Sequence, residues 1–177
     1  MRWLLLFALL LCPPCVPLLA DEGAETAEGS AAEDLLPPGR SGLPLPRFVS
    51  LRANEVNLRA GPGIRYHIEW VHRRAGQPVE VVDEYDTWRR IRDWEGTLGW
   101  VHQSMLQNRR NVRVVADDQL LRHEPGDGAR AVARVEAGAI GGLRSCQDGW
   151  CEIDFSGLVG WLPHDSFYGV YPDETGD

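Results

Sequence analysis

Two segments of this chain repeat each other with an offset of 61 to 63 residues. Turn residues recur every 8–12 positions in both segments, and neither carries a sustained helical period. A repeat of this length therefore indicates two copies of one small β-barrel-like unit, a class that more often binds ligands than transforms them. The matched positions are Leu58-Arg59 with Leu121-Arg122, Gly76 with Gly138, Trp88 with Trp150, and Gly99-Trp100-Val101 with Gly160-Trp161-Leu162.

The expected fold is all-β, with two tandem small barrels. We assign residues 47–110 to the first unit (repeat one), 111–171 to the second (repeat two), and 172–177 to a disordered tail. Short alternating segments predict the strands, and turn residues such as Ala60-Gly61-Pro62-Gly63 separate them. Strands are expected at 48–58, 68–71, 78–85, 88–93 and 97–102 in repeat one. In repeat two they are expected at 119–122, 131–135, 140–146, 150–155 and 158–162.

The N-terminus reads as a secretory signal peptide over residues 1–20. Arg2 precedes a short apolar run, prolines follow it, and cleavage is expected after Ala20. A retained N-terminal anchor is the alternative, and lipid modification of Cys12 or Cys15 is a further one. Residues 21–46 contain six acidic residues against one arginine and predict a disordered linker. The sequence thus predicts a periplasmic or secreted protein.

Charge argues against nucleic acid as a ligand. Residues 47–171 carry sixteen arginines against seventeen acidic residues, whereas a nucleic-acid-binding domain carries a net basic surface.

The opening and closing motifs of each repeat resemble those of bacterial SH3-like domains. Residues 56–63, Val-Asn-Leu-Arg-Ala-Gly-Pro-Gly, are similar to the opening signature of that family, and Gly99-Trp100-Val101 is similar to its closing motif. Gly160-Trp161-Leu162 closes repeat two in the same way, although residues 119–125 depart from the opening signature. The resemblance implies tandem SH3-like barrels that act as a binding module of the cell envelope. Related domains are often the cell-wall-targeting parts of larger hydrolases, and we expect no hydrolase in this sequence.

Little in repeats one and two predicts catalysis. Cys146 and Cys151 flank a turn between two predicted strands, so we expect a disulfide bond; the alternative is a reactive thiol near His164. The histidines do not group as metal ligands, and no hydrolase or phosphate-loop motif occurs. Carboxylates at Asp83-Glu84-Asp86 and Asp117-Asp118 are expected to be solvated. We therefore expect no enzyme activity, no metal and no cofactor.

The candidate binding residues lie in repeat one. Side chains alternate along a strand, so Ile91 and Val101 are expected to point inward. The residues then expected on the outer face are Trp88, Arg90, Arg92, Trp94, Leu98 and Trp100. Tryptophan and arginine are typical of binding hot spots. Trp70 is equally compatible with the core. The predicted contact residues are Tyr66, Trp70, Trp88, Arg90, Arg92, Trp94 and Trp100.

Two hypotheses compete for this outer face. Peptidoglycan or its stem peptides is the leading ligand, and an envelope enzyme or an extended peptide bound by an adaptor is the alternative. A further hypothesis is that the two repeats cover the face themselves. In that docking hypothesis, Arg90 and Arg92 pair with Glu152 and Asp154 of repeat two.

Overall fold

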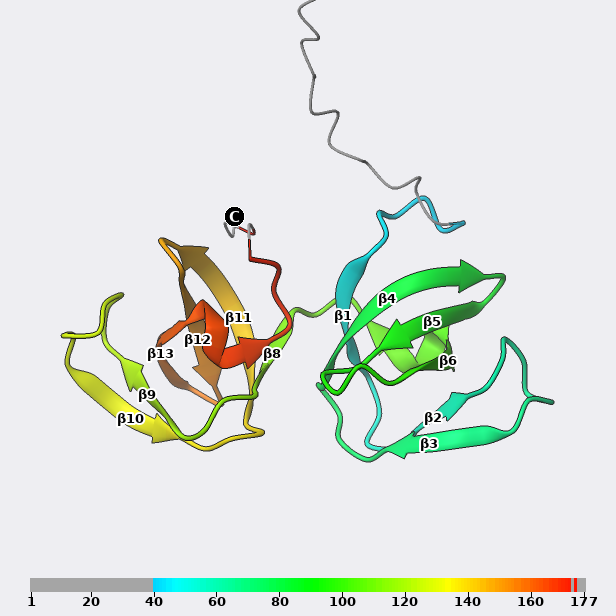
Figure 1. The fold of residues 1–177 in the computed structure, drawn as a ribbon, viewed down its shortest axis with the longest axis horizontal. Coiled ribbons are helices and arrows are strands. Elements are labelled where there is room, and N and C mark those ends of the chain that lie inside the picture. The colour runs from blue at the N-terminus through cyan, green and yellow to red at the C-terminus, as the bar shows by residue number, and fades with distance from the viewer. Residues whose placement is uncertain (1–39, 173, 175–177) are drawn as a thin grey trace, which may run out of the picture. The chain divides into compact units, whose positions relative to one another are not determined.

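The computed structural model describes residues 40–172 and 174. The predicted signal peptide, Cys12, Cys15 and most of the predicted linker lie outside the described residues. The described chain is all-β and forms two seven-stranded sheets, one from each repeat (Figure 1). The predicted fold class and the tandem arrangement are confirmed.

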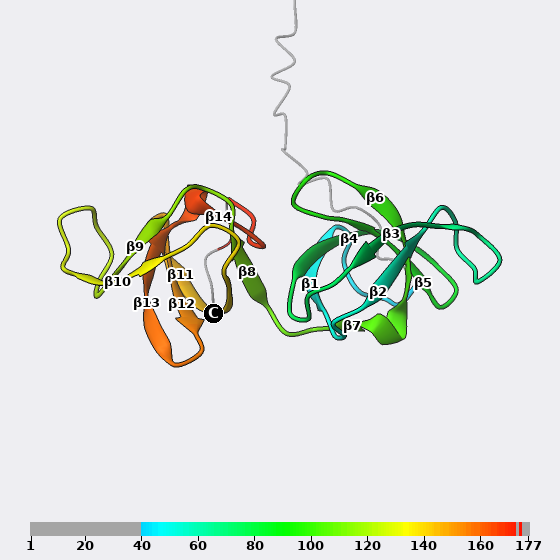
Figure 2. The same cartoon turned by 90° about the horizontal axis from the view of Figure 1, so that it is seen from below.

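Both sheets have the same strand order. In repeat one it is β3-β2-β6-β5-β4-β1-β7, and in repeat two it is β10-β9-β13-β12-β11-β8-β14 (Figure 2). The repeat-one elements are β1 (Arg47–Leu51), β2 (Val56–Arg59), β3 (Ile68–His72), β4 (Pro78–Tyr85), β5 (Trp88–Arg92), β6 (Leu98–His102), the 3₁₀ turn η1 (Gln103–Met105) and β7 (Leu106–Gln107). The repeat-two elements are β8 (Asn111–Val114), β9 (Gln119–Arg122), β10 (Ala131–Val135), β11 (Ile140–Gln147), β12 (Trp150–Phe155), β13 (Leu158–Pro163), η2 (His164–Ser166) and β14 (Phe167–Tyr168).

Each repeat buries its own hydrophobic core. Ile91 and Val101 are fully buried, as the alternation predicts. The core of repeat one consists of Val49, Leu51, Val56, Leu58, Val79, Val81, Ile91, Val101 and Leu106. The core of repeat two includes Val112, Val114, Leu121, Val135, Ile153, Leu162 and Phe167. The outer faces of the strands are consequently left to polar and aromatic residues.

The opening and closing motifs of each repeat pack against each other. A Cβ atom at Gly99 would collide with the Leu58 side chain, and one at Gly160 would lie 2.6 Å from the Leu121 Cγ atom. Glycine is therefore required because the core leucine of one strand crosses directly over it. The tryptophan that follows the glycine points to the opposite, outer face.

Both ends of the described chain extend beyond the boundaries expected from the sequence. The Ser41 backbone N–H, within the predicted linker, donates to Glu84 Oε2 at 2.7 Å, and Leu45 packs against the core. At the other end, Glu174 lies in the predicted tail and accepts hydrogen bonds from Arg110. Within residues 40–172 and 174, no helix is long and apolar enough to cross a membrane.

Candidate functional site

The outer face of repeat one carries a row of side chains across five adjacent strands. Arg90 on β5 lies opposite Trp100 on β6, and Trp100 lies opposite Arg59 on β2. Ile68 on β3 and Asp83 on β4 end the row on either side. The sheet thus places one tryptophan between two arginines, Arg59 and Arg90.

The two arginines have different roles. Arg59 Nη1 donates to the carbonyl oxygens of Ile64 (3.2 Å) and Tyr66 (2.7 Å), so it fastens the β2–β3 loop beside Trp100. The Tyr66 ring lies over Gly61, where a Cβ atom would be 2.5 Å from the ring. Arg90 is exposed, and no carboxylate of the described residues forms an ion pair with it. Its guanidinium is available to an anionic ligand.

Trp88 lies in a neighbouring aromatic row. It is paired with His102 across β5 and β6, with ring centroids 5.5 Å apart in an edge-on arrangement, and with Tyr85 across β4 and β5. Tyr85 is half exposed. Trp88, Arg90 and Trp100 are therefore brought together on one face, as predicted.

Arg92 continues the alternation of β5 on the outer face, but its guanidinium already has a partner, and Trp94 does not join the face as predicted. Arg92 Nη1 pairs with Glu80 at 3.2 Å, and its carbonyl oxygen accepts a hydrogen bond from Tyr168. β5 ends at Arg92, so the alternation does not extend to Trp94, whose ring instead lies 4.1 Å from the Arg113 guanidinium. Both residues serve contacts with repeat two.

Trp70 and Tyr66 lie on the β2–β3 hairpin. Trp70 is 56% exposed on β3, which has β2 as its sheet neighbour and forms one end of the strand order. It is therefore not part of the core, although the sequence left that alternative open.

The predicted docking pairs do not form. Arg92 pairs with Glu80, while Asp154 pairs with Arg144 of its own repeat at 2.8 Å. The contacts between repeats come from other residues, which lie on β8, on the turn at Gly138, on β14 and on the segment after β14. Phe48 packs against Tyr168 and Tyr171, Tyr171 Oη donates to Glu80 at 3.0 Å, and Asn111 Nδ2 donates to the Gly76 carbonyl at 2.6 Å.

A buried ion cluster in repeat one was not predicted. Glu84 was expected to be solvated, yet its side chain is 1% exposed and contacts Arg47 (2.7 Å) and Arg89 (3.2 Å). Burial alone would raise the pKa of Glu84, but hydrogen bonds from Ser41 and Arg47 and the Arg89 charge outweigh it, and the pKa is lowered. The carboxylate is thus held in its charged form.

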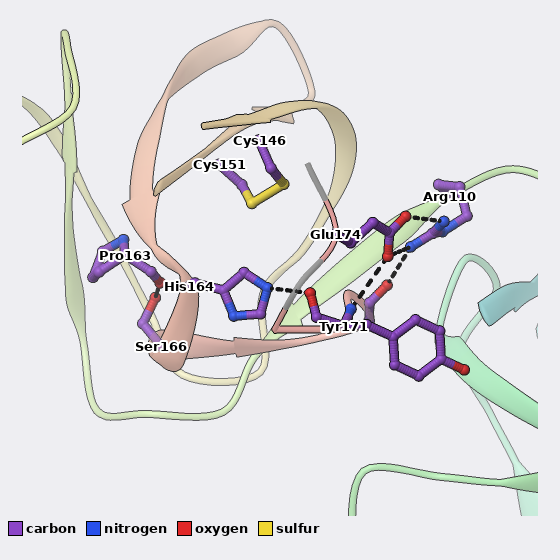
Figure 3. The surroundings of a disulfide bond; sticks show 9 residues. Arg110, Cys146, Cys151, Pro163, His164, Ser166, Tyr171 and Glu174 are labelled. Carbon is purple, nitrogen blue, oxygen red and sulfur yellow. Dashed lines mark hydrogen bonds and ion pairs between the residues drawn. A yellow bond between two sulfur atoms is a disulfide. The ribbon is translucent and has the colours of Figure 1, made fainter. Parts of the chain in front are cut away.

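The predicted disulfide between Cys146 and Cys151 is confirmed (Figure 3). The two residues face each other across β11 and β12, with Asp148 and Gly149 in the left-handed region at the turn. The bond leaves no free thiol at either position, which removes the nucleophile from the alternative site near His164. His164 Nε2 lies 2.9 Å from the Tyr171 carbonyl oxygen.

Repeat two has the same outer row with different chemistry. Arg122 and Trp161 occupy the places of Arg59 and Trp100, and Arg122 Nη1 likewise donates to a loop carbonyl, that of Ala129, at 2.7 Å. The exposed arginine is replaced, because Glu152 lies opposite Trp161 where repeat one has Arg90. Aligning the sequences of the two repeats would have revealed that Glu152 stands where repeat one has Arg90.

No group of three potential metal ligands occurs within residues 40–172 and 174. The outer face of repeat one presents an aromatic side chain, Trp100, beside the exposed guanidinium of Arg90.

Comparison with known proteins identifies the repeated unit. The family model described as "Bacterial SH3 domain" matches residues 52–108 and 115–166. A Bacillus subtilis protein named "Putative N-acetylmuramoyl-L-alanine amidase YrvJ" is 21% identical over 123 residues, covering 63% of this chain. The chain spans 24% of the length of that relative.

Solved structures with detectable similarity resemble the chain only distantly. NlpC1 from Trichomonas vaginalis is 16% identical with a TM-score of 0.33, over 69% of this chain and 45% of its own. An NlpC/P60 family protein from Bacillus cereus is 15% identical with a TM-score of 0.31, over 68% of this chain and 55% of its own.

Proposed function

The chain belongs to the bacterial SH3 domain family, and on this premise we propose that it is a non-catalytic binding protein of the cell envelope. Repeat one recognises peptidoglycan through the row formed by Arg59, Trp100 and Arg90. The observation that carries this proposal is the exposed Arg90 guanidinium, which lies beside Trp100 and has no carboxylate partner among the described residues.

The chemistry of peptidoglycan suits this row. Its stem peptides carry carboxylates, which a guanidinium binds through charge-assisted hydrogen bonds. Its sugar rings present flat apolar faces on which an aromatic side chain can stack. The Bacillus subtilis relative is named as an amidase of the N-acetylmuramoyl-L-alanine linkage, which supports a ligand from the cell wall.

An exported location is part of the proposal. Residues 1–20 would direct export, and the protein would act in the periplasm or outside the cell. The Cys146–Cys151 disulfide supports this location, because such bonds persist in oxidising compartments. Since both cysteines are bonded, neither supplies a catalytic thiol, and binding is the role we assign.

Co-sedimentation of the purified protein with isolated peptidoglycan sacculi tests the proposal. Arg90→Glu gives position 90 the residue type found at the matching position of repeat two. We expect it to reduce bound protein at least ~10-fold, because it removes a charge-assisted contact and adds repulsion. Trp100→Ala should cause a similar loss.

The matching substitutions in repeat two are the controls. Glu152→Arg and Trp161→Ala should leave at least half of the binding, because repeat one is unaltered. If wild-type protein does not sediment with sacculi, or if the repeat-two variants lose binding as fully as Arg90→Glu, this proposal is wrong.

A further inference from the structure

The β2–β3 hairpin of repeat one exposes a series of large apolar side chains. Ile64, Tyr66, Ile68 and Trp70 occur at every second position and are 80%, 49%, 44% and 56% exposed. Isolated apolar residues on a surface need no explanation, but several adjoining ones on one element indicate an interaction site. These four residues are hereafter the apolar edge.

Repeat two has the same backbone without the apolar edge. Its matching residues, found 63 positions later, are Asp127, Ala129, Ala131 and Ala133. The pairing is conserved: Ala131 and Ala133 lie opposite Arg122 and Leu121, as Ile68 and Trp70 lie opposite Arg59 and Leu58. The large apolar side chains are therefore not needed to form the hairpin.

The backbone of β3 is also available for pairing. β3 ends the strand order of its sheet, and its described ladder partner is β2. A register shift lies between Leu58 and Arg59, so Ile68 is opposite outward-facing Arg59 and Trp70 is opposite buried Leu58. An added strand would meet apolar side chains on both of its faces. An exposed edge of this kind is a template for strand addition.

Charge indicates the kind of strand that fits. Residues 56–74 carry four arginines against one glutamate, whereas the matching residues 119–137 carry three of each sign. Arg65 is exposed between Ile64 and Tyr66, and exposed Arg73 and Arg74 follow the end of β3. Arg73 lies 3.8 Å from Glu55 in an exposed pair, and Arg74 donates to the Gly138 carbonyl oxygen. An acidic ligand is attracted to this hairpin and not to its counterpart.

We infer that β3 of repeat one binds an extended acidic peptide segment of a protein partner as an added β-strand, with apolar side chains of the peptide against Ile68 on one face and against Trp70 on the other. This site adjoins the row of Arg59, Trp100 and Arg90 through Ile68, but it uses the β3 backbone and gives the protein a second ligand class. β3 (Ile68–His72) has five residues, about 13 Å over four steps at a strand rise of ~3.3 Å, so a segment of about five residues pairs with it.

Fluorescence polarisation of labelled synthetic peptides with the purified protein tests the inference. The probes are seven-residue peptides with three central valines, which present apolar side chains to both faces; the valines are flanked by glutamates, by lysines, or by glutamates with proline as the central residue. We expect the acidic peptide to bind at least ~10-fold more tightly than the lysine peptide. Proline should weaken it by a similar factor because a ladder hydrogen bond is lost. Hydrogen exchange at the β3 amides should slow when the acidic peptide binds.

Matched variants locate the site. Ile68→Ala with Trp70→Ala copies repeat two and should abolish acidic-peptide binding, while Ala131→Ile with Ala133→Trp should leave it unchanged. Far-ultraviolet circular dichroism verifies that each variant folds. We expect the double alanine variant to fold, because repeat two already carries alanine at the matching positions.

Three results would overturn the inference. One is equal affinity for the acidic and lysine peptides. Another is displacement of the acidic peptide by peptidoglycan oligosaccharides, which would assign the edge to a glycan. The third is a concentration-dependent dimer in analytical ultracentrifugation that the double alanine variant removes, because the occupant would then be a second copy of the chain.

Discussion

The two repeats stabilise the same hairpin position by different chemistry. Glu84 faces Arg89 across β4 and β5, and Cys146 faces Cys151 across β11 and β12. Each pair lies next to the turn of the equivalent hairpin. Repeat one fills this position with a buried ion pair, and repeat two fills it with a covalent bond. One sheet geometry therefore accepts either solution, provided that the two facing side chains are complementary.

The arginine beside each pair follows the same logic. Arg47 binds Glu84 in repeat one. Its counterpart Arg110 has no glutamate at position 146, and it instead binds Glu174 from the C-terminal segment at 2.6 Å (Figure 3). Burial alone would raise the pKa of Glu174, but the hydrogen bond from Arg110 outweighs it and the pKa is lowered. With a disulfide where repeat one has the carboxylate, the arginine of repeat two pairs with a carboxylate from another segment.

Glu84→Ala should give the largest difference between the repeats. It leaves Arg47 and Arg89 buried without a counter-charge, which costs about 3–5 kcal/mol. Hydrogen exchange at the β5 amides should accelerate far more than at the β12 amides. Equal acceleration in both repeats would show that they unfold as one unit.

Acid should destabilise repeat one more than repeat two in the wild-type protein. The folded-state pKa of Glu84 lies below its ordinary value of 4.5. Its stabilising contribution is therefore complete above that value and is lost as the pH falls through the lower, folded-state pKa. The melting temperatures of wild type and Glu84→Gln, measured from about pH 7 to about pH 3, should converge as the pH falls. A constant difference would contradict the assignment.

Removal of the disulfide should have a smaller effect, confined to repeat two. Cys146→Ser with Cys151→Ser opens a short loop, for which chain entropy predicts a loss of about 2 kcal/mol. The β12 amides should exchange faster while the β5 amides are unchanged. Faster exchange at β5 would mean that the disulfide also supports repeat one.

Glu174→Gln should give the smallest change. The Arg110 and Glu174 side chains are 32% and 26% exposed, so solvent screens this pair and its loss should cost up to about 1 kcal/mol. Chemical denaturation should show a loss in the free energy of unfolding well below that of Glu84→Ala, which removes the buried carboxylate at the equivalent pair. A loss as large as that of Glu84→Ala would show that solvent exposure does not explain the difference in strength between the two arginine–carboxylate pairs.

Much of the fold was predictable because it depends on local pattern. Alternation identified β4 and the inward orientation of Ile91 and Val101, and turn residues placed the hairpins. The short strands β7, β8 and β14 were missed, since two to four residues carry too little periodicity. The alternation was also carried too far, to Trp94, which lies beyond the strand expected at 88–93 and beyond the end of β5 at Arg92.

The candidate site was predicted in part. Trp88, Arg90 and Trp100 lie together because strand period and hairpin register are local properties. The sequence could not decide which carboxylate pairs with Arg92. The partner is Glu80 on the adjacent strand β4, and not Glu152 or Asp154 of repeat two. Of the apolar edge, the sequence analysis predicted only Tyr66 and Trp70 as contact residues. Comparing these positions with the alanines of repeat two would have revealed the whole edge.

The sequence by itself determined the two repeated all-β units, the disulfide, and the glycine–tryptophan motifs that separate core from outer face. Tertiary structure alone decided that Glu84 is buried between two arginines, that Glu174 binds Arg110, and that the segment after β14 contacts repeat one. The physical reason is distance along the chain. Alternation and turns act between near neighbours, whereas an ion pair depends on which strands the completed sheet places side by side.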